Sequence, residues 1–239
     1  MHDGSVARRT GEETRALLLR VGIEMLFERG AAAGVQHIRL QDVLRRAGLT
    51  TGAAYRLWTD QTEYQRDLAV AMIDLRYSDP IANASAAVAP LIARQAPIDE
   101  VIRVAAETHA IDAERKQDVS NGRDTQAFLL ALALRAAGGT APELREASRR
   151  RHEDSIAGFD VFYQRLMDEY GWRMKTPYRI RDFTEAMAAL GEGFAIRALQ
   201  GIAHPRLDLE PDHEGPDGRW SLFGIAVRGL VHEFMTPVR

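Results

Sequence analysis

The sequence from Ile38 to Trp58 is IRLQDVLRRAGLTTGAAYRLW. Apolar residues at positions 40, 43, 44 and 47 follow helical spacing, and Gly48 then favours the left-handed conformation that ends a helix. We expect Thr50 to cap a second short helix, because its hydroxyl can accept a hydrogen bond from a backbone N–H of the next turn. Two helices joined by so short a turn cross steeply. The stretch therefore predicts a helix-turn-helix, in which the second helix is free to enter a DNA major groove.

The flanking segments extend this pattern. Residues 14–30 are expected to form an amphipathic helix that ends at Gly30, with Leu18 and Leu26 on its apolar face. Downstream, Asp60 and Glu63 have the spacing of a capping box and predict a helix that begins at residue 61.

Residues 14–75 resemble the DNA-binding domain of the TetR family of bacterial transcriptional regulators. The resemblance rests on the spacing of Arg15, Leu18, Leu19, Gly30, Asp42, Val43 and the run from Ala47 to Trp58. It implies an all-α fold, in which an N-terminal three-helix bundle with a helix-turn-helix precedes a larger C-terminal helical domain for regulation and dimerisation. The expected divisions are a flexible tail over 1–10, a DNA-binding domain over 11–60, and a ligand-binding and dimerisation domain over 61–239.

The sequence departs from the family pattern at two helix starts and in one loop. The family usually has a hydroxyl residue where this chain has Ile38-Arg39, and a Lys aimed at a phosphate where it has Gln61. A hydrogen bond from Gln61 would replace that contact without its counterion-release contribution. The loop over residues 31–37 is also longer than in the family.

DNA contacts are expected around the second helix of the motif. Arg56 is the candidate for a bidentate contact to guanine, and Tyr55 is expected to donate to a phosphate. The full set of DNA-binding candidates is Arg39, Gln41, Thr50, Thr51, Gly52, Ala53, Tyr55, Arg56, Leu57 and Gln61. The chain carries a net charge of −3, so DNA affinity must depend on where arginines 39, 45, 46 and 56 are placed.

Beyond residue 66 the sequence is rich in Ala and Leu and predicts helices throughout. The expected ranges are 61–77, 81–95, 98–118, 123–137, 142–170, 178–202 and 219–235. The polar stretch 203–218 is expected to be a solvated loop. Cysteine is absent, which excludes disulfides and thiolate chemistry, and no apolar run is long enough for a membrane span, so we expect a cytoplasmic protein without a membrane partner.

The last two expected helices, 178–202 and 219–235, carry apolar and small residues at helical spacing. By the resemblance they are expected to form a dimer interface that contains Met187, Phe194, Val227, Leu230 and Phe234. The alternative is that both are ordinary core helices, because amphipathicity alone does not separate an intramolecular from an intermolecular partner.

A small apolar ligand is expected in the C-terminal domain, because the family commonly has a pocket there. The candidate lining residues are Phe128, Phe159, Phe162, Tyr163, Met167, Tyr170 and Trp172, with Met187 or Phe194 closing the cavity. The same residues at the same spacing would equally form a packed core.

The sequence as a whole predicts a homodimeric transcriptional regulator, most often a repressor in this family, that binds a pseudo-palindromic operator and is released by a small molecule. One alternative is a DNA-binding regulator that has no effector or is controlled by a protein partner. A second alternative is an all-helical enzyme with a vestigial helix-turn-helix. No catalytic constellation is apparent in the sequence, and we expect neither an enzyme, a metal site nor a cofactor.

Overall fold

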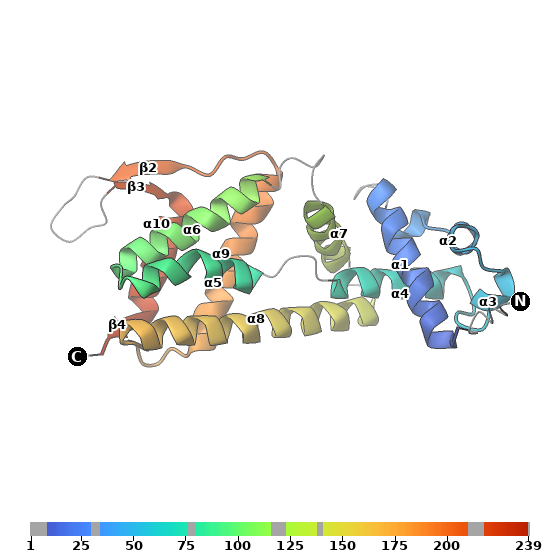
Figure 1. Cartoon of the computed structure of the whole chain (residues 1–239), viewed down its shortest axis with the longest axis horizontal. Coiled ribbons are helices and arrows are strands. Elements are labelled where there is room, and N and C mark those ends of the chain that lie inside the picture. The colour runs from blue at the N-terminus through green and yellow to red at the C-terminus, as the bar shows by residue number, and fades with distance from the viewer. Residues whose placement is uncertain are drawn as a thin grey trace, which may run out of the picture. The chain divides into compact units, whose positions relative to one another are not determined.

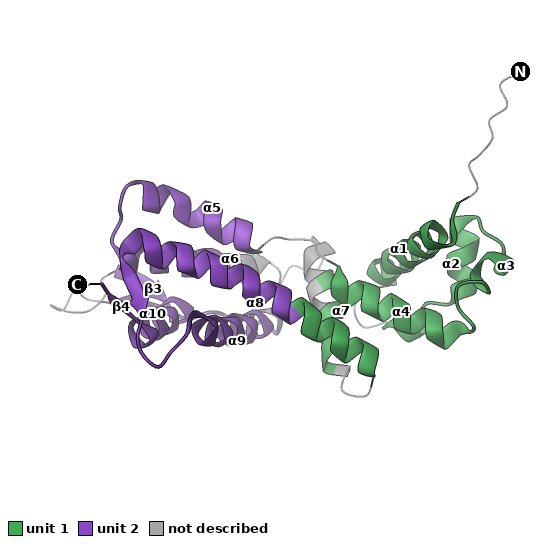
Figure 2. Ribbon diagram, turned by 90° about the horizontal axis from the view of Figure 1, so that it is seen from below, with its two compact units in different colours: residues 1–77, 123–151 green, residues 78–122, 152–239 purple. Residues whose placement is uncertain are grey.

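A computed structural model describes residues 9–29, 34–75, 80–115, 123–137, 141–209 and 218–238. The chain forms two compact units (Figure 2). Unit 1 contains residues 1–77 and 123–151, and unit 2 contains residues 78–122 and 152–239. The first eight residues of the expected tail lie outside the described part of the chain.

The helices of unit 1 enclose a single apolar core. In chain order they are α1 (Gly11–Arg29), the 3₁₀ helix η2 (Val35–His37), α2 (Leu40–Ala47), α3 (Thr51–Ala54), α4 (Gln61–Asp74), α7 (Arg123–Ala137) and the beginning of α8 (Pro142–Tyr170) (Figure 1). Leu18, Leu26, Trp58, Tyr64 and Leu68 are almost completely buried there. The core therefore joins the helix-turn-helix to α1 and α4.

The first helix begins at Gly11, three residues before the expected start at Thr14. Thr10 and Glu13 cause the difference, because each caps the other: Glu13 N–H donates to the Thr10 hydroxyl at 3.2 Å, and Thr10 N–H donates to the Glu13 carboxylate at 2.8 Å. The Thr-x-x-Glu pattern at residues 10–13 is the sequence signal for this earlier start.

Unit 2 is built from α5 (Pro80–Ala93), α6 (Ile98–Arg115), the remainder of α8, α9 (Ile180–Leu199) and α10 (Leu222–Phe234). Helix α6 contacts α5, α9 and α10 (Figure 1). Residues of α6 contribute to two apolar clusters, Ile102 and Ala106 to one and Val101 to the other. One contains Phe183, Trp220 and Phe223, and the other contains Val88 and Val101.

Short strands in unit 2 correct the expectation that every element after residue 66 is helical. β1 (Trp172–Met174) pairs antiparallel with β4 (Met235–Pro237), and β2 (Arg206–Leu209) pairs antiparallel with β3 (Gly218–Ser221). The expected loop 203–218 therefore contains β2 and the first residue of β3. The last helix begins at Leu222 instead of residue 219, because the Ser221 hydroxyl accepts from Gly224 N–H at 3.0 Å and caps it there.

The expected boundary at residue 60 does not coincide with a division between compact units. Helix α4 packs on α1 and α7, so both sides of that boundary belong to unit 1. Residues 123–151 also group with the N-terminal helices, because Leu130 and Ala147 are buried in their core. The functional division into a DNA-binding and a ligand-binding domain stays a prediction.

Candidate nucleic-acid interface

The turn between α2 and α3 has the geometry that Gly48 predicts. Gly48 ends α2 with φ 65° and ψ 30°, in the left-handed region, and Leu49 N–H then donates to the Leu44 carbonyl at 2.9 Å. The expected cap by Thr50 is wrong, because its hydroxyl makes no capping hydrogen bond although its backbone is extended. Helix α3 is only four residues long, and its turn begins through the bond from Ala53 N–H to the Thr50 carbonyl.

Helix α2 is capped by side chains of α4. Arg39 stands at its N-cap and provides no side-chain cap. Instead, the Gln61 amide oxygen accepts from Leu40 N–H at 2.8 Å, and the Gln61 amide nitrogen donates to the Ile38 carbonyl at 2.8 Å. Gln65, one turn later, donates to the carbonyl of Gln36 at 2.9 Å. Helix α4 thus holds the start of α2 by directed hydrogen bonds.

Asp67 ties three segments of unit 1 together. Its Oδ2 atom accepts from Trp58 Nε1 at 2.6 Å and from Arg15 Nη2 at 2.6 Å. Trp58 follows α3 and Arg15 lies on α1, so one carboxylate of α4 fixes both neighbours. This gives a structural role to two of the residues on which the family resemblance rests.

Helix α1 approaches α4 closely at Gly22. A Cβ atom at this position would lie 2.2 Å from the Tyr64 hydroxyl oxygen and 2.9 Å from Leu68 Cδ1. The Tyr64 hydroxyl donates to the Leu18 carbonyl at 3.3 Å, and burial raises the pKa of Tyr64. The close approach therefore depends on the missing side chain at position 22.

The start of α4 confirms half of the expected capping box. The Asp60 carboxylate accepts from Glu63 N–H at 2.8 Å. The Glu63 carboxylate bonds to the backbone N–H and the hydroxyl of Thr59, both at 2.7 Å, instead of to Asp60. The hydrogen bonds from Thr59 lower the pKa of Glu63, since they favour its charged form.

Most DNA-binding candidates lie on the exposed surface of the motif. Those that are exposed are Arg39, Gln41, Thr50, Thr51, Gly52, Tyr55 and Arg56. Tyr55 is 69% exposed, which is unusual for so large a ring. Ala53 and Leu57 are half-buried, and Leu57 packs against the core; their DNA contacts stay predictions.

Gln61 is placed differently from the expectation. It is half-buried, and both ends of its amide are bonded to the backbone at the start of α2. A phosphate contact would require these bonds to be exchanged. Sequence reasoning missed this role because the partners lie 21 and 23 residues away along the chain.

The four arginines of the motif divide into two pairs. Arg45 lies 3.0 Å from Asp42, and Arg46 makes two bonds of 2.5 Å with Glu28, which raise the pKa of its guanidinium. Arg39 and Arg56 have no ion-pair partner among the described residues. Their charges are therefore the ones available to an anionic partner.

A hollow of about 530 Å³ lies between α2, α3 and the start of α4. Arg39, Gln41, Thr51 and Tyr55 contribute to its lining. The arrangement offers guanidinium, amide and hydroxyl donors around one concave surface. Such donors suit phosphate oxygens and base edges.

The candidate pocket residues of unit 2 belong to packed clusters. Phe162 packs with α5 and α6, whereas Tyr163, Met167 and Met187 pack with the cluster around Phe183. Phe159 is half-buried, with its ring stacked on Tyr163 at a centroid distance of 5.8 Å. The side chain of Phe128 lies outside the described part of the structure. The pocket assignment stays a prediction.

The candidate dimer residues also make contacts within the chain. Val227 is 8% exposed, and Met187, Phe194, Leu230 and Phe234 are half-buried against the same cluster. The rings of Phe194 and Phe223 lie 5.2 Å apart, and those of Phe183 and Phe234 lie 5.8 Å apart. The dimer assignment likewise stays a prediction.

The described residues contain no group of three or more His, Asp or Glu side chains that could hold a metal ion. No helix in the same part of the chain is both long and apolar enough to cross a membrane.

Comparison with solved structures identifies the fold. E. coli NemR in its reduced form superposes with a TM-score of 0.52 at 15% identity, covering 94% of this chain and 99% of NemR. A Rhodococcus protein described as a TetR-family transcriptional regulator gives a TM-score of 0.46 at 16% identity, covering 80% of this chain and 89% of that one. No family model and no curated protein matched the sequence significantly. The chain has the all-α fold of the TetR-family regulators, as the resemblance predicted.

Proposed function

We propose that this protein is a TetR-type transcriptional regulator, not an enzyme, and that it binds double-stranded DNA through α2, α3 and the turn after α3. The observation that carries the proposal is the exposed pair Arg39 and Arg56 beside the exposed Tyr55, on a motif whose other arginines are already neutralised. Arg56 is assigned to a base edge, Tyr55 and Arg39 to phosphates, and Thr51 to a base edge or sugar.

Selection from a pool of random duplexes by the full-length protein tests this proposal. We expect enrichment of a pseudo-palindrome, because two-fold proteins of this kind bind two half-sites about one helical turn apart. Arg39→Ala and Arg56→Ala should weaken binding to the selected site more than Arg45→Ala. Recovery of no common sequence, together with equal affinities of the three variants, would refute the proposed interface.

We further propose that the protein acts as a homodimer through α9 and α10. Gly193 on α9 and Gly229 on α10 are exposed, and a Cβ atom at either position would face open space beyond its own helix backbone and chain neighbours in the described structure. Small residues of this kind allow a second helix to approach closely. Two linked half-sites would also multiply a modest affinity for each.

We also propose that the protein represses a nearby gene in the bacterial cytoplasm. A small apolar ligand that binds in unit 2 would control its release from DNA. A ligand can shift DNA affinity only by its different affinities for two states of the protein. A regulator without an effector is the alternative. Thermal melts with a ligand library separate the two, because a ligand of the folded state raises Tm.

A further inference from the structure

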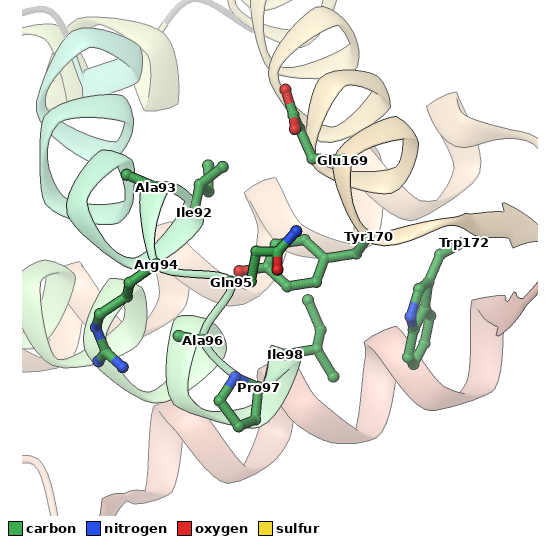
Figure 3. Close-up of a pocket in the computed structure, with 10 residues that line it drawn as sticks. All are labelled: Ile92, Ala93, Arg94, Gln95, Ala96, Pro97, Ile98, Glu169, Tyr170 and Trp172. Atoms are coloured by element: carbon green, nitrogen blue, oxygen red, sulfur yellow. The ribbon is translucent and has the colours of Figure 1, made fainter.

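We propose that a cleft at one end of unit 2 binds a small organic cation that carries a flat apolar ring. The cleft has a volume of about 680 Å³ and lies between the α5–α6 turn and the α8–β1 turn (Figure 3). Of its lining residues, only Tyr170 and Trp172 also belong to the apolar pocket expected from the sequence. Binding there does not depend on whether the protein also binds DNA.

Three side chains give the cleft an apolar part, although most of its accessible lining is polar. Ile98 belongs to both apolar clusters of unit 2, so it is held firmly between them. The half-buried rings of Tyr170, at the end of α8, and Trp172, on β1, face the cleft (Figure 3). Aromatic faces attract cations, because the ring quadrupole is negative above the plane.

The charges around the cleft favour a cation. Arg94 is neutralised by Glu100, 2.5 Å away, whereas Glu169 has no ion-pair partner among the described residues. Helices α5 and α8 both end at the cleft, and a helix C-terminus carries the negative end of the macrodipole. Helix α6 begins there with its positive end, but Asp99 and Glu100 in its first turn oppose it.

The backbone of the α5–α6 turn disfavours an anion. Gln95 N–H donates to the Ile92 carbonyl at 2.9 Å, and Ala96 N–H donates to the Leu91 carbonyl at 3.0 Å. Pro97 has no N–H group to offer. The turn therefore presents no spare amide donors at these three positions for a carboxylate or phosphate.

Tyr170 supplies a polar atom that lacks a partner. Its hydroxyl is buried and makes no hydrogen bond with any described residue. Burial raises the pKa of Tyr170; the charge of Arg94 opposes this increase, and the carboxylates of Glu100 and Glu169 add to it. Figure 3 shows the ring of Tyr170 behind the side chain of Gln95. Gln95 has a left-handed backbone (φ 54°), a strained conformation for this residue that recurs at binding sites. A shift of the Gln95 side chain would let the Tyr170 hydroxyl accept from a ligand ammonium.

Titration of the full-length protein with three benzene derivatives tests the proposal: protonated benzylamine, neutral benzyl alcohol and anionic benzoate. Intrinsic fluorescence reports on the cleft, because Trp58 and Trp220 are each only 2% exposed whereas Trp172 lines it. Calorimetry gives the affinities independently. We expect saturable millimolar binding of benzylamine, weaker binding of benzyl alcohol and no binding of benzoate.

Variants locate the site. Glu169→Gln should weaken benzylamine binding about three- to fivefold, the size expected for a partly screened charge contact. The matched control is Asp168→Asn, next to it on α8, which should have no effect because Asp168 bonds to Gln164 outside the cleft. Trp172→Phe should abolish the fluorescence change while calorimetry still detects binding.

Three results would overturn the proposal: no saturable binding of benzylamine, binding of benzoate at equal affinity, or an affinity that Glu169→Gln leaves unchanged. Circular dichroism of each variant separates a lost site from a lost fold. None of these measurements contains DNA, so failure here leaves the proposed DNA-binding function standing.

Discussion

The helix-turn-helix of unit 1 and the helix pair α9–α10 of unit 2 both have apolar-patterned helices packed on a core, but directed polar bonds are more prominent in the first. In unit 1, single polar groups add to the apolar core: Gln61 caps α2, and Asp67 bonds to Trp58 and Arg15. In unit 2, α9 and α10 pack mainly through aromatic rings, such as Phe194 on Phe223. Directed bonds leave no choice of partner, whereas apolar packing accepts a second chain as readily as the same chain.

The two regions therefore differ in what a substitution can reveal. The bonds of Gln61 and Asp67 that hold the motif do not involve Arg39, Tyr55 or Arg56. These exposed side chains are therefore available for an external partner. In α9 and α10 the same half-buried residues contribute to the fold and to the proposed dimer. Experiments in unit 2 must separate folding from association, and experiments in unit 1 must separate phosphate from base contacts.

The largest effect is expected from charge at the proposed dimer interface. A two-fold interface meets itself, so Leu230→Asp places two like charges near each other. Burial of uncompensated charge costs about 3–5 kcal/mol, so dimerisation should weaken at least about a hundredfold. Light scattering at micromolar concentration should show a folded monomer, and operator affinity should fall toward that of one half-site.

Two further variants make this test decisive. Gly229→Arg adds bulk and charge at an exposed position where a Cβ atom meets open space, so it should also disrupt the dimer without unfolding the subunit. Val161→Asp on α8 is the control, because Val161 is 71% exposed and lies outside α9 and α10. A Leu230→Asp protein that stays dimeric and binds DNA normally would place both helices in an ordinary core.

Close packing at Gly22 should give the next largest effect, on stability. Gly22→Ala places a Cβ atom 2.2 Å from the Tyr64 hydroxyl, so either the side chains of Tyr64 and Leu68 or the helices must shift. We expect a loss of about 1–3 kcal/mol in the free energy of unfolding, measured by urea denaturation. Gly52→Ala on α3 is the matched control in the absence of DNA, because open space and better helix propensity predict a gain of up to about 1 kcal/mol.

A second substitution identifies the clashing atom. Tyr64→Phe in the Gly22→Ala protein removes the nearest oxygen but leaves Leu68 Cδ1 at 2.9 Å, so it should restore part of the lost stability. Equal stabilities of Gly22→Ala and the wild type would show that α1 and α4 have room to adjust.

The sequence predicted local structure well and long-range partners poorly. Helices α7 and α8 have the expected bounds, and Gly48 has the expected left-handed backbone, because periodicity and capping act within a few residues. The cap that Gln61 gives to α2 was missed because its partners are distant in sequence. The strands β1 and β4 were missed for the same reason, since Trp172 pairs with Pro237.

The candidate site follows the same division. Exposure of Arg39, Tyr55 and Arg56 agrees with their expected roles, since these polar side chains lie on a short helical motif. The sequence could not show that Arg46 is paired with Glu28 of α1, which removes it from the available charge. Nor could it separate a pocket from a core at Phe162 or Tyr163, because both need the same apolar residues.

Base reading by Arg56 is expected to change specificity by about 1–3 kcal/mol at one operator position. Arg56→Ala should relax the preference there, measured as the affinities for duplexes that differ in one base pair. Arg46→Ala is the control, because Glu28 already neutralises this arginine. A uniform loss on all duplexes, with a shallower salt dependence, would assign Arg56 to a phosphate instead.

Tyr55 should give the smallest effect and the cleanest one. Its ring is 69% exposed, so Tyr55→Phe removes a hydroxyl without disturbing the core, and Tm should not change. The loss of one phosphate hydrogen bond should weaken binding to operator and to non-specific DNA alike, by about 1 kcal/mol. The salt dependence should stay the same, because the phenol carries no charge.

The control is Tyr178→Phe in unit 2, which loses a hydrogen bond of 2.9 Å to Glu233 and should leave DNA affinity unchanged. A loss confined to the operator would instead assign the Tyr55 hydroxyl to a base, and no loss at all would remove Tyr55 from the interface.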